Sequence, residues 1–555
     1  MSNSKLWGSL REPRVRSMIG IVFLLVLFSF YLFFVAANLT TTFDDAYMFL
    51  RYAGNVLNGY GIAWNPDSVQ TYGATSLLYL ALVTFGRAVF SFADGSAMLV
   101  ITSALLGLIS LVLMWFGCLR LVKADFFKNY PLAFPLFLAV VFFLSPTFLL
   151  HATSGMDTTL ALLCNTLLIF AALTWVRKND LASLAWLILA AYASFLARPD
   201  NLIYAVLFPV LYGFFFFREQ RMKMIAQFLI SLLLLIVIDT AIKFLVFGDP
   251  LPLPFYAKTV GYDAGYTGAA RWNPVNYLFD FFQLVLPFLL FFIFSLSKQT
   301  RFLSAAFFVP VTVTFAYYFS LTQIMGFGAR YYFPSLPFFV IGIFLMLDIF
   351  LQQRSFAVLV RQPVRVGIAV GTVVFFLLSP IENSLAALYE KYFIPVPVVY
   401  ESKMAQGMRS NLPELGWWQT INAMAEVASQ LPAGTRVAMS EYGLIGADAP
   451  QILVIDMLGL HDPFFAHNGF SAAEFFTREP DLIWFPYPDY TRIVSSIQDD
   501  PRLWNEYEYY PGAFDYGIAI RIHSEYYEDI HRVLEKVWKD IYPDFDIENA
   551  LAVKP

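Results

Sequence analysis

Charged residues are scarce in this chain. Asp, Glu, Lys and Arg make up 14% of its 555 residues, whereas 59% are hydrophobic and the mean hydropathy is +0.62. Soluble globular domains carry about 25% charged residues. The shortage therefore excludes an ordinary soluble protein and predicts that most of the chain lies in a lipid bilayer.

Cysteine is nearly absent as well. The chain has two, Cys118 and Cys164, in apolar runs where we expect them to pack as small hydrophobic residues. This excludes a disulfide framework and a thiolate metal site. Residues 381–555 also lack a phosphate-binding glycine loop, an HExxH motif and a nucleophile elbow, so they show no sign of chemistry of their own.

Long apolar runs are abundant. A helix needs about 20 apolar residues to span a bilayer, and eleven runs are expected to do so: 17–37, 97–119, 131–150, 156–176, 181–197, 201–217, 224–247, 276–296, 302–322, 331–351 and 364–380. A twelfth, 75–92, is short and contains Arg87, and we expect it to lie in the interface or re-enter. The basic N-terminus precedes the first run without a small-residue cleavage site, which predicts an uncleaved span.

Basic residues predict the orientation, because cytoplasmic loops are enriched in Lys and Arg. With eleven spans, all the basic clusters fall on one side: the N-terminus, Arg120/Lys123/Lys128, Arg177/Lys178, Arg218/Arg221/Lys223, Lys298/Arg301 and Arg354/Arg361/Arg365. We therefore expect a multi-pass protein of the cytoplasmic membrane with a cytoplasmic N-terminus and an extracytoplasmic C-terminal domain.

Charge also divides the chain into two parts. Residues 1–380 hold 24 Lys and Arg against 15 Asp and Glu, whereas 381–555 hold 12 against 26. The sequence thus predicts a transmembrane domain over 1–380, with its first outer loop at 38–75, and a soluble α/β domain over 381–555. In the latter we expect helices near 417–430 and 526–540 and strands near 435–440, 452–458, 481–486 and 514–522. An acidic exterior domain argues against nucleic acid as a partner.

The most distinctive polar pattern follows the first apolar run, at residues 41–73. It holds the pair Asp44-Asp45 and then Tyr47, Arg51 and Tyr52 at helical spacings. The carboxylates are compatible with capping the following helix. They are equally compatible with accepting the proton of an acceptor hydroxyl or holding a divalent cation. Arg51 lies two turns from Asp44, where an interfacial or salt-bridging role is as well supported as a functional one.

Other polar residues are predicted at the outer ends of spans: His151, Asp157, Arg198, Asp200, Lys258 and Arg330. Charges avoid hydrocarbon, so we expect them to line one outward-facing polar cavity with the first loop. Arg330 lies in the run GFGARYY, where a guanidinium suits bidentate binding of a phosphate. The pair formed by Arg198 and Asp200 is also typical of a structural contact.

Two further segments, loop 248–275 and the region of His461 and His467, are compatible with a purely structural role as well as with a functional one. The prolines of DPLPLPFYAK argue against a helix at the start of loop 248–275, which is either a lid or a passive connector. His461 and His467 follow a predicted strand and are expected in a turn.

The run DDAYMFLRYAGNVLNGYGIAWNPDSVQTYG resembles the first outer loop of bacterial GT-C glycosyltransferases that use polyprenyl-phosphate sugars, including arabinofuranosyltransferases. The similarity continues in SGMDT (154–158), ARPDN (197–201), GARYYFPSLPF (328–338) and the tail segments AMSEYGLIGADAP and VIDMLGLHDPFFA. The family often has two glutamates where this chain has DSVQTYGAT (67–75), and glutamate in place of Asp157 and Asp200. The identity of the substrate therefore does not transfer.

The resemblance implies a GT-C fold and inverting transfer of a sugar from a lipid phosphate to a hydroxyl of a glycan or lipid acceptor outside the membrane. It implies that Asp44 is the base or metal-associated carboxylate, with Asp45 as its partner. We assign the donor phosphate to Arg330, Lys258, Arg198 and His151, with supporting roles for Arg51, Asp157, Asp200, Tyr47 and Tyr72. No cofactor is certain; Mg²⁺ or Mn²⁺ at Asp44, Asp45 and Asp157 is one option.

Two other classes of protein stay open. A polytopic transporter or lipid flippase carries charged or broken helices near the bilayer centre, whereas the charges here gather at span ends, with Asp239 and Lys243 as isolated exceptions. A membrane anchor for an exterior binding domain does not require eleven spans.

Overall fold

The architecture was taken from a computed structural model of the whole chain. It describes residues 13–41, 43–66, 69–91, 94–258, 273–320, 327–353, 366–368, 370–372, 415–487 and 490–543. Contacts between Cα atoms divide the chain into two compact units. The first unit comprises residues 1–41, 96–236 and 271–394, and the second comprises 42–95, 237–270 and 395–555. The predicted first outer loop thus belongs to the same unit as the C-terminal residues.

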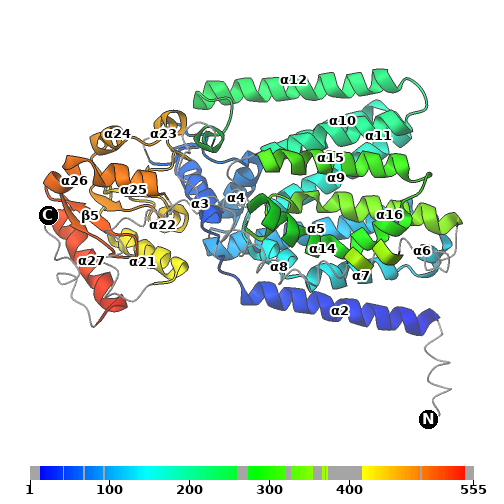
Figure 1. Cartoon of the computed structure of the whole chain (residues 1–555), viewed down its shortest axis with the longest axis horizontal. Coiled ribbons are helices and arrows are strands. Elements are labelled where there is room, and N and C mark those ends of the chain that lie inside the picture. The colour runs from blue at the N-terminus through cyan, green and yellow to red at the C-terminus, as the bar shows by residue number, and fades with distance from the viewer. Residues whose placement is uncertain are drawn as a thin grey trace, which may run out of the picture. The chain divides into compact units, whose positions relative to one another are not determined.

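The first unit is built from helices, and most of its long ones run roughly parallel to one another (Figure 1). They are α2 (Pro13–Ala37), α5 (Gly95–Leu121), α6 (Asp125–Asn129), α7 (Ala133–Phe143), α8 (Pro146–Thr153), α9 (Thr158–Lys178), α10 (Leu181–Ala197), α11 (Leu202–Phe216), the first part of α12 (Arg221–Phe247), α14 (Asn273–Ser295), α15 (Arg301–Ser320) and α16 (Leu336–Gln353). Short 3-10 turns lie at η1 (Pro199–Asn201), η4 (Phe327–Ala329) and η5 (Phe333–Ser335).

Many of these helices are long and apolar enough to cross a bilayer. In the part of the chain that the structure describes, eight helices meet this condition, and a ninth span results if the bent pair α7 and α8 is one crossing. The run predicted at 131–150 is this pair, bent by 76°, while the helix at 181–197 is shorter. Most of the run at 364–380 lies outside the described residues. The count of eleven spans therefore stays a prediction.

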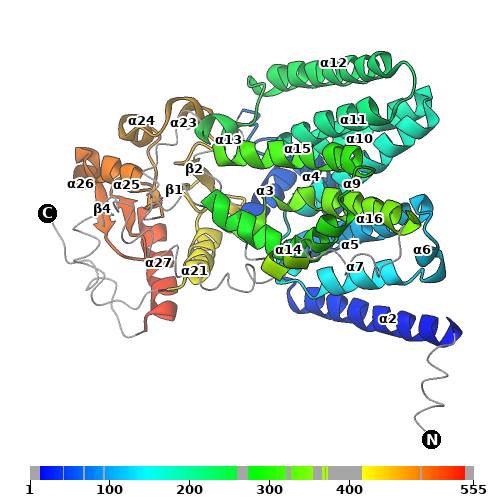
Figure 2. The same ribbon diagram turned by 45° about the vertical axis from the view of Figure 1, so that its right-hand side comes forward.

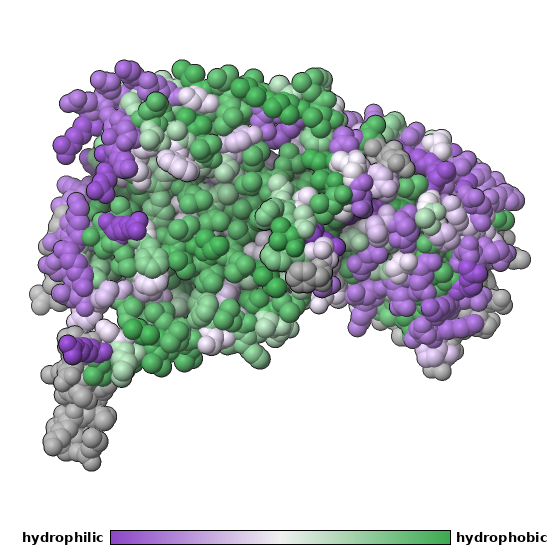
Figure 3. All heavy atoms as spheres, turned by 180° about the vertical axis from the view of Figure 1, so that it is seen from behind, coloured by the Kyte–Doolittle hydropathy of each residue, from purple (hydrophilic) through white to green (hydrophobic). Residues whose placement is uncertain are grey.

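The surface of the helical unit suits lipid. Figure 3 shows hydrophobic side chains over most of this unit. Large apolar residues of α2 and α12, such as Phe33 and Leu233, are exposed. In water such a surface would be an aggregation hazard, whereas in a bilayer it is the normal outer face of a helix. The chain is a multi-pass membrane protein.

Inside this unit, α9 is fixed to its neighbours by buried polar contacts. The Asn165 side chain donates to the Pro334 carbonyl at 2.8 Å, and the Ser194 hydroxyl of α10 donates to Asn165 Oδ1 at 2.6 Å. A buried amide of this kind is stable only when it is hydrogen-bonded, so it specifies how the helices pack. α9 ends at Asn179 in the left-handed conformation, and Asp180 caps the start of α10 through the Ser183 N–H.

The second unit contains a five-stranded mixed sheet in the order β2-β1-β3-β5-β4. Its strands are β1 (Arg436–Met439), β2 (Leu453–Asp456), β3 (Leu482–Trp484), β4 (Tyr507–Tyr510) and β5 (Ile518–Arg521). β1 pairs in parallel with β2 and β3, whereas β5 pairs antiparallel with β3 and β4. The buried runs Val-Ala-Met and Val-Ile-Asp explain why β1 and β2 lie inside the domain.

Helices cover the sheet of this unit (Figure 2). They are α21 (Trp417–Gln430), α22 (Gly443–Asp448), α23 (Pro463–Asn468), α24 (Ala472–Thr477), α25 (Thr491–Gln498), α26 (Pro501–Glu506) and α27 (Tyr527–Ile541). The first-loop helices α3 (Asp44–Leu57) and α4 (Leu77–Val89), the end of α12 and α13 (Leu253–Tyr256) complete the unit.

The predicted α/β character of the C-terminal domain is confirmed. Four expected strands and the helices α21 and α27 lie where the hydrophobic patterns place them. β4 was missed, because YEYY directly follows the short helix α26 and carries little periodic signal. The prediction of no helix at the start of loop 248–275 was wrong, because the short helix α13 lies there. Pro254 is in the first turn of α13, where the N–H that proline lacks would have no partner within the helix.

Candidate functional site

The first-loop helix α3 places Asp44, Tyr47 and Arg51 on one face, because residues three, four and seven apart share a side of a helix. All three are buried. The residue at the N-cap is Phe43, and no side chain caps the helix there. The interpretation of Asp44 or Asp45 as a helix cap is therefore not realised, although both lie in the first turn.

Asp44 contacts the segment that follows β1. Its two carboxylate oxygens accept backbone N–H groups at the start of α22, Gly443 to Oδ2 and Leu444 to Oδ1, each at 2.8 Å. A Cβ at position 443 would lie 1.9 Å from the Asp44 carbonyl oxygen, so only glycine allows this approach. Asp44 is 9% exposed.

A third carboxylate, Glu441, belongs to this group. It is half-buried and lies close enough to Asp44 and Asp45 to interact with both charges. Burial and these two charges raise the pKa of Glu441 to about 8. Burial and the Asp45 charge also raise the pKa of Asp44 to about 6, against the lowering effect of the Leu444 and Gly443 N–H groups. Near neutral pH the group thus holds a proton.

Glu441 was missed in the sequence, although a signal was present. It follows the predicted strand 435–440, and functional residues often lie directly after a strand end. The sequence does not show that Glu441 lies near Asp44, which is 397 positions earlier. In the structure the neighbouring residues Gly443 and Leu444 contact Asp44, and Glu441 lies beside them.

Arg51 is the counterpart of Asp44 at the other end of α22. Its guanidinium donates to the carbonyls of Gly446 (2.7 Å), Ala449 (3.3 Å) and Ile452 (2.9 Å). It also donates to the Trp64 carbonyl and Asn65 Oδ1. It is 3% exposed, and burial lowers its pKa to about 10. Arg51 is therefore a buried cation that binds carbonyls and not an interfacial side chain.

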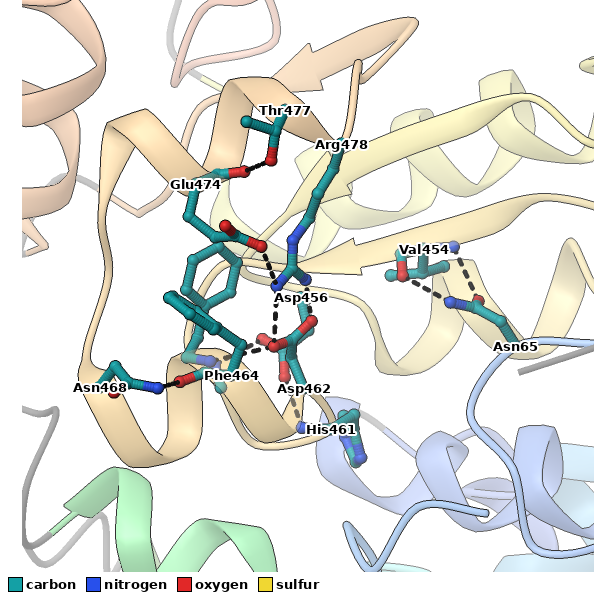
Figure 4. Close-up of polar contacts among 12 residues, drawn as sticks. Asn65, Val454, Asp456, His461, Asp462, Phe464, Asn468, Glu474, Thr477 and Arg478 are labelled. Carbon is teal, nitrogen blue, oxygen red and sulfur yellow. Dashed lines mark hydrogen bonds and ion pairs between the residues drawn. The ribbon is translucent and has the colours of Figure 1, made fainter. Parts of the chain in front are cut away.

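Asn65 ties the same loop to the edge of the sheet. Its amide donates to the Val454 carbonyl and accepts the Val454 N–H, both at 2.9 Å, as Figure 4 shows. This pairing satisfies an edge-strand residue of β2. Gln70, at a position where the resembled family often has glutamate, accepts the Ile62 N–H at 2.6 Å and shapes the turn of the loop.

His461 and Tyr52 form a buried pair below this loop. The His461 ring stacks on Trp64 at 3.9 Å, and its Nδ1 lies 2.9 Å from the Tyr52 hydroxyl. Burial lowers the pKa of His461 well below its usual value, so the ring is neutral and its Nδ1 accepts a hydrogen bond from the Tyr52 hydroxyl. The expected turn is present at His461: Asp456 accepts three backbone N–H groups there, from Leu458, Gly459 and His461, the last of which is drawn in Figure 4. For His467 the prediction of a turn was wrong, because it lies in the helix α23, which begins at Pro463.

The other predicted residues of the second unit have packing roles. Tyr47 lies near the Trp418 ring, with centroids 6.3 Å apart. Tyr72 stacks on Phe247 at 4.9 Å, and its carbonyl accepts the Leu253 N–H of α13. Lys258, just after α13, is half-buried.

A separate polar cluster lies in the first unit. Arg198, which ends α10, pairs with Asp200 (3.1 Å) and Asp157 (3.6 Å). The Tyr318 hydroxyl of α15 donates to Asp200 at 2.5 Å, and the Arg198 guanidinium lies 4.8 Å from the Tyr331 ring centre. Both predicted carboxylates thus neutralise Arg198, which matches the structural interpretation of this pair.

His151 and Arg330 belong to the same cluster. His151 Nε2 donates to the Gly328 carbonyl at 2.7 Å, while its Nδ1 is buried with no hydrogen-bond partner among the described residues. Gly328 and Ala329 have φ of 64° and 65°, and this turn presents Arg330, which is half-buried. The arrangement offers the Arg330 guanidinium to an anion, whereas a neutral His151 has its one N–H on Gly328 and none left for an anion.

The structure thus brings the predicted residues together in two groups, one in each unit. Asp44 and Asp45 meet Glu441, while Asp157, Arg198, Asp200, His151 and Arg330 meet in the helical unit. Among the described residues, no group of three or more His, Cys, Asp or Glu side chains is arranged to hold a metal ion. The suggested metal at Asp44, Asp45 and Asp157 accordingly gains no geometric support.

The spans define the class as a multi-pass membrane protein, and comparison with known families adds one match. Residues 403–528 match the model of a domain of unknown function, DUF8728. This match covers less than a quarter of the chain. No curated protein matches the sequence.

Proposed function

We propose that this protein is an inverting glycosyltransferase of the GT-C type, which moves a sugar from a polyprenyl phosphate to a hydroxyl of a glycan or lipid acceptor. The observation that carries the proposal is the pair Asp44 and Asp45, on the loop that follows the first membrane span, together with Glu441 of the C-terminal domain beside them. A base for a hydroxyl needs a proton affinity close to the working pH, and this group has it.

In this proposal Asp44 accepts the proton of the acceptor hydroxyl. Its two N–H bonds orient the carboxylate while leaving two of about four lone-pair positions for the acceptor. Burial and the Asp45 charge raise its proton affinity. The acceptor oxygen forms a bond to the anomeric carbon as the bond to the phosphate oxygen breaks, so the configuration inverts and no protein nucleophile is required.

The leaving group is the polyprenyl phosphate, which departs as an anion and needs positive charge rather than an acid. Arg330 of the helical unit supplies N–H donors suited to a phosphate, with Arg198 held in place by its two carboxylates. A neutral His151 has its one N–H on the Gly328 carbonyl, so in this proposal it positions the turn before Arg330. Lys258 adds a further positive charge. The proposed location is the cytoplasmic membrane, with the N-terminus cytoplasmic and the second unit outside.

The test is transfer by the purified protein in proteoliposomes, using a panel of radiolabelled polyprenyl-phosphate monosaccharides that begins with arabinofuranose. Envelope glycans and glycolipids serve as acceptors. A labelled glycan or glycolipid supports the proposal. Movement of the labelled lipid between leaflets without any transfer would instead indicate the flippase alternative.

A further inference from the structure

The C-terminal domain of unknown function touches the proposed base directly. The hydrogen bonds that join Asp44 to this domain lie at the start of α22, where the Gly443 and Leu444 N–H groups donate to the carboxylate. At the other end of α22, Arg51 binds the Gly446 and Ala449 carbonyls. α3 and α22 are therefore locked together at two points.

We propose that the C-terminal domain is a positioning element for the reaction, and that it acts through α22 by orienting the Asp44 carboxylate. This rests on the proposed function. The N-cap of α3 is Phe43, without a side-chain cap, and the hydrogen bonds described for the Asp44 carboxylate come from α22. These two N–H groups orient the carboxylate, because each oxygen has its own donor at 2.8 Å.

The Gly443 backbone lies so close to Asp44 that there is no room for a side chain at position 443. A Cβ at position 443 would lie 1.9 Å from the Asp44 carbonyl oxygen and 2.8 Å from Asp44 Cγ. The groups that titrate next to Asp44 are Asp45 on α3 and Glu441 just before α22. The N–H groups are the ones that favour the ionised form of Asp44, whereas burial and the Asp45 charge oppose it.

The first experiment compares Gly443→Ala with Gly54→Ala in the full-length protein. Gly54 lies on the same helix as Asp44 and has no atom within 4 Å of an added Cβ, so its variant is the matched control. We expect Gly443→Ala to lower turnover on the order of 10²-fold with the KM for the donor unchanged, since a small misplacement of a catalytic group is costly. Wild-type turnover in Gly443→Ala would overturn the proposal.

A second variant covers the case in which Gly443→Ala does not fold. Replacing Leu444 by its α-hydroxy acid turns one amide into an ester and deletes a single N–H without changing a side chain. We expect the acidic limb of the pH profile to move up by about one pH unit, because the ionised Asp44 loses a charge-assisted donor. An unmoved limb would overturn the proposal.

Carbodiimide labelling of carboxyl groups, read by mass spectrometry, separates this inference from the proposed function. We expect more labelling of Asp44 in Gly443→Ala than in Gly54→Ala, with the exposed Asp125 as the internal standard. This readout needs no activity. If no donor is turned over by the wild type, the proposed function fails while positioning is still measured; if labelling is unchanged, positioning fails.

Discussion

Asp44 and Arg51, seven residues apart on one face of α3, hold opposite ends of α22. The carboxylate accepts N–H groups at its start, and the guanidinium donates to carbonyls at its end. The N–H groups at the start of a helix and the C=O groups at its end have no partner within the helix, and these are the groups that Asp44 and Arg51 bind. The distance between Asp44 and Arg51 along α3 thus matches the length of α22. The first loop and the C-terminal residues accordingly belong to one unit.

Replacing Arg51 by Met is expected to destabilise the second unit. The change keeps the apolar volume but leaves the buried Gly446 and Ile452 carbonyls without their donor, at a cost of about 1–3 kcal/mol for each acceptor. Thermal unfolding in detergent measures it, with the exposed Arg492→Met as the control. Equal melting temperatures for the two variants would show that the Arg51 contacts contribute nothing.

Glu441→Gln is expected to stabilise the protein at alkaline pH and not at acidic pH. The folded state raises the pKa of Glu441 from 4.5 to about 8, so it binds more protons than the unfolded state between these values. Wild-type stability therefore falls as pH rises through this window and is flat above it. The difference in melting temperature between variant and wild type should grow from pH 4.5 to pH 8. A constant difference would contradict the shifted pKa.

Arg330→Ala is expected to weaken binding of the lipid donor. A guanidinium presents two parallel N–H donors to a phosphate, a pairing worth about 1.5–3 kcal/mol, or roughly tenfold to a hundredfold in Kd. Binding of a fluorescent polyprenyl phosphate measures it, with the exposed Arg218→Ala as the control. Should both variants bind as the wild type does, Arg330 has no part in donor recognition.

The rate of transfer is expected to fall as pH drops through about 6, because burial and the Asp45 charge place the pKa of Asp44 there. Below this value the base is protonated and accepts no proton from the acceptor. Initial rates at saturating donor from about pH 4 to about pH 8 give the profile over about two pH units on each side of the midpoint. A rate that is level across pH 6 would remove Asp44 as the titrating base.

The sequence was informative where a pattern is local. Apolar length predicts the long helices, and short apolar runs predict the buried strands β1, β2, β3 and β5. The pair Asp44-Asp45 was found because adjacent carboxylates after a span are rare. Glu441 was missed because its role depends on a contact across 399 positions, which no local periodicity records.

Arg51 illustrates the same limit. Arg51 lies seven residues after Asp44, so its position on the same helix face was predictable. Its partners are mainly backbone carbonyls, which every residue has. Such contacts leave no residue signature. The same holds for Tyr52, whose partner His461 was expected only to lie in a turn.

The central claim is that Asp44 is the base of a sugar transfer, and single-turnover kinetics of Asp44→Asn test it most directly. Asn keeps the shape and can accept an N–H through its one oxygen, but it does not take a proton. We predict that the variant binds a polyprenyl-phosphate sugar with wild-type affinity and transfers it on the order of 10²–10⁴-fold more slowly, while Asp125→Asn transfers normally. Transfer by Asp44→Asn at the wild-type rate would contradict the account.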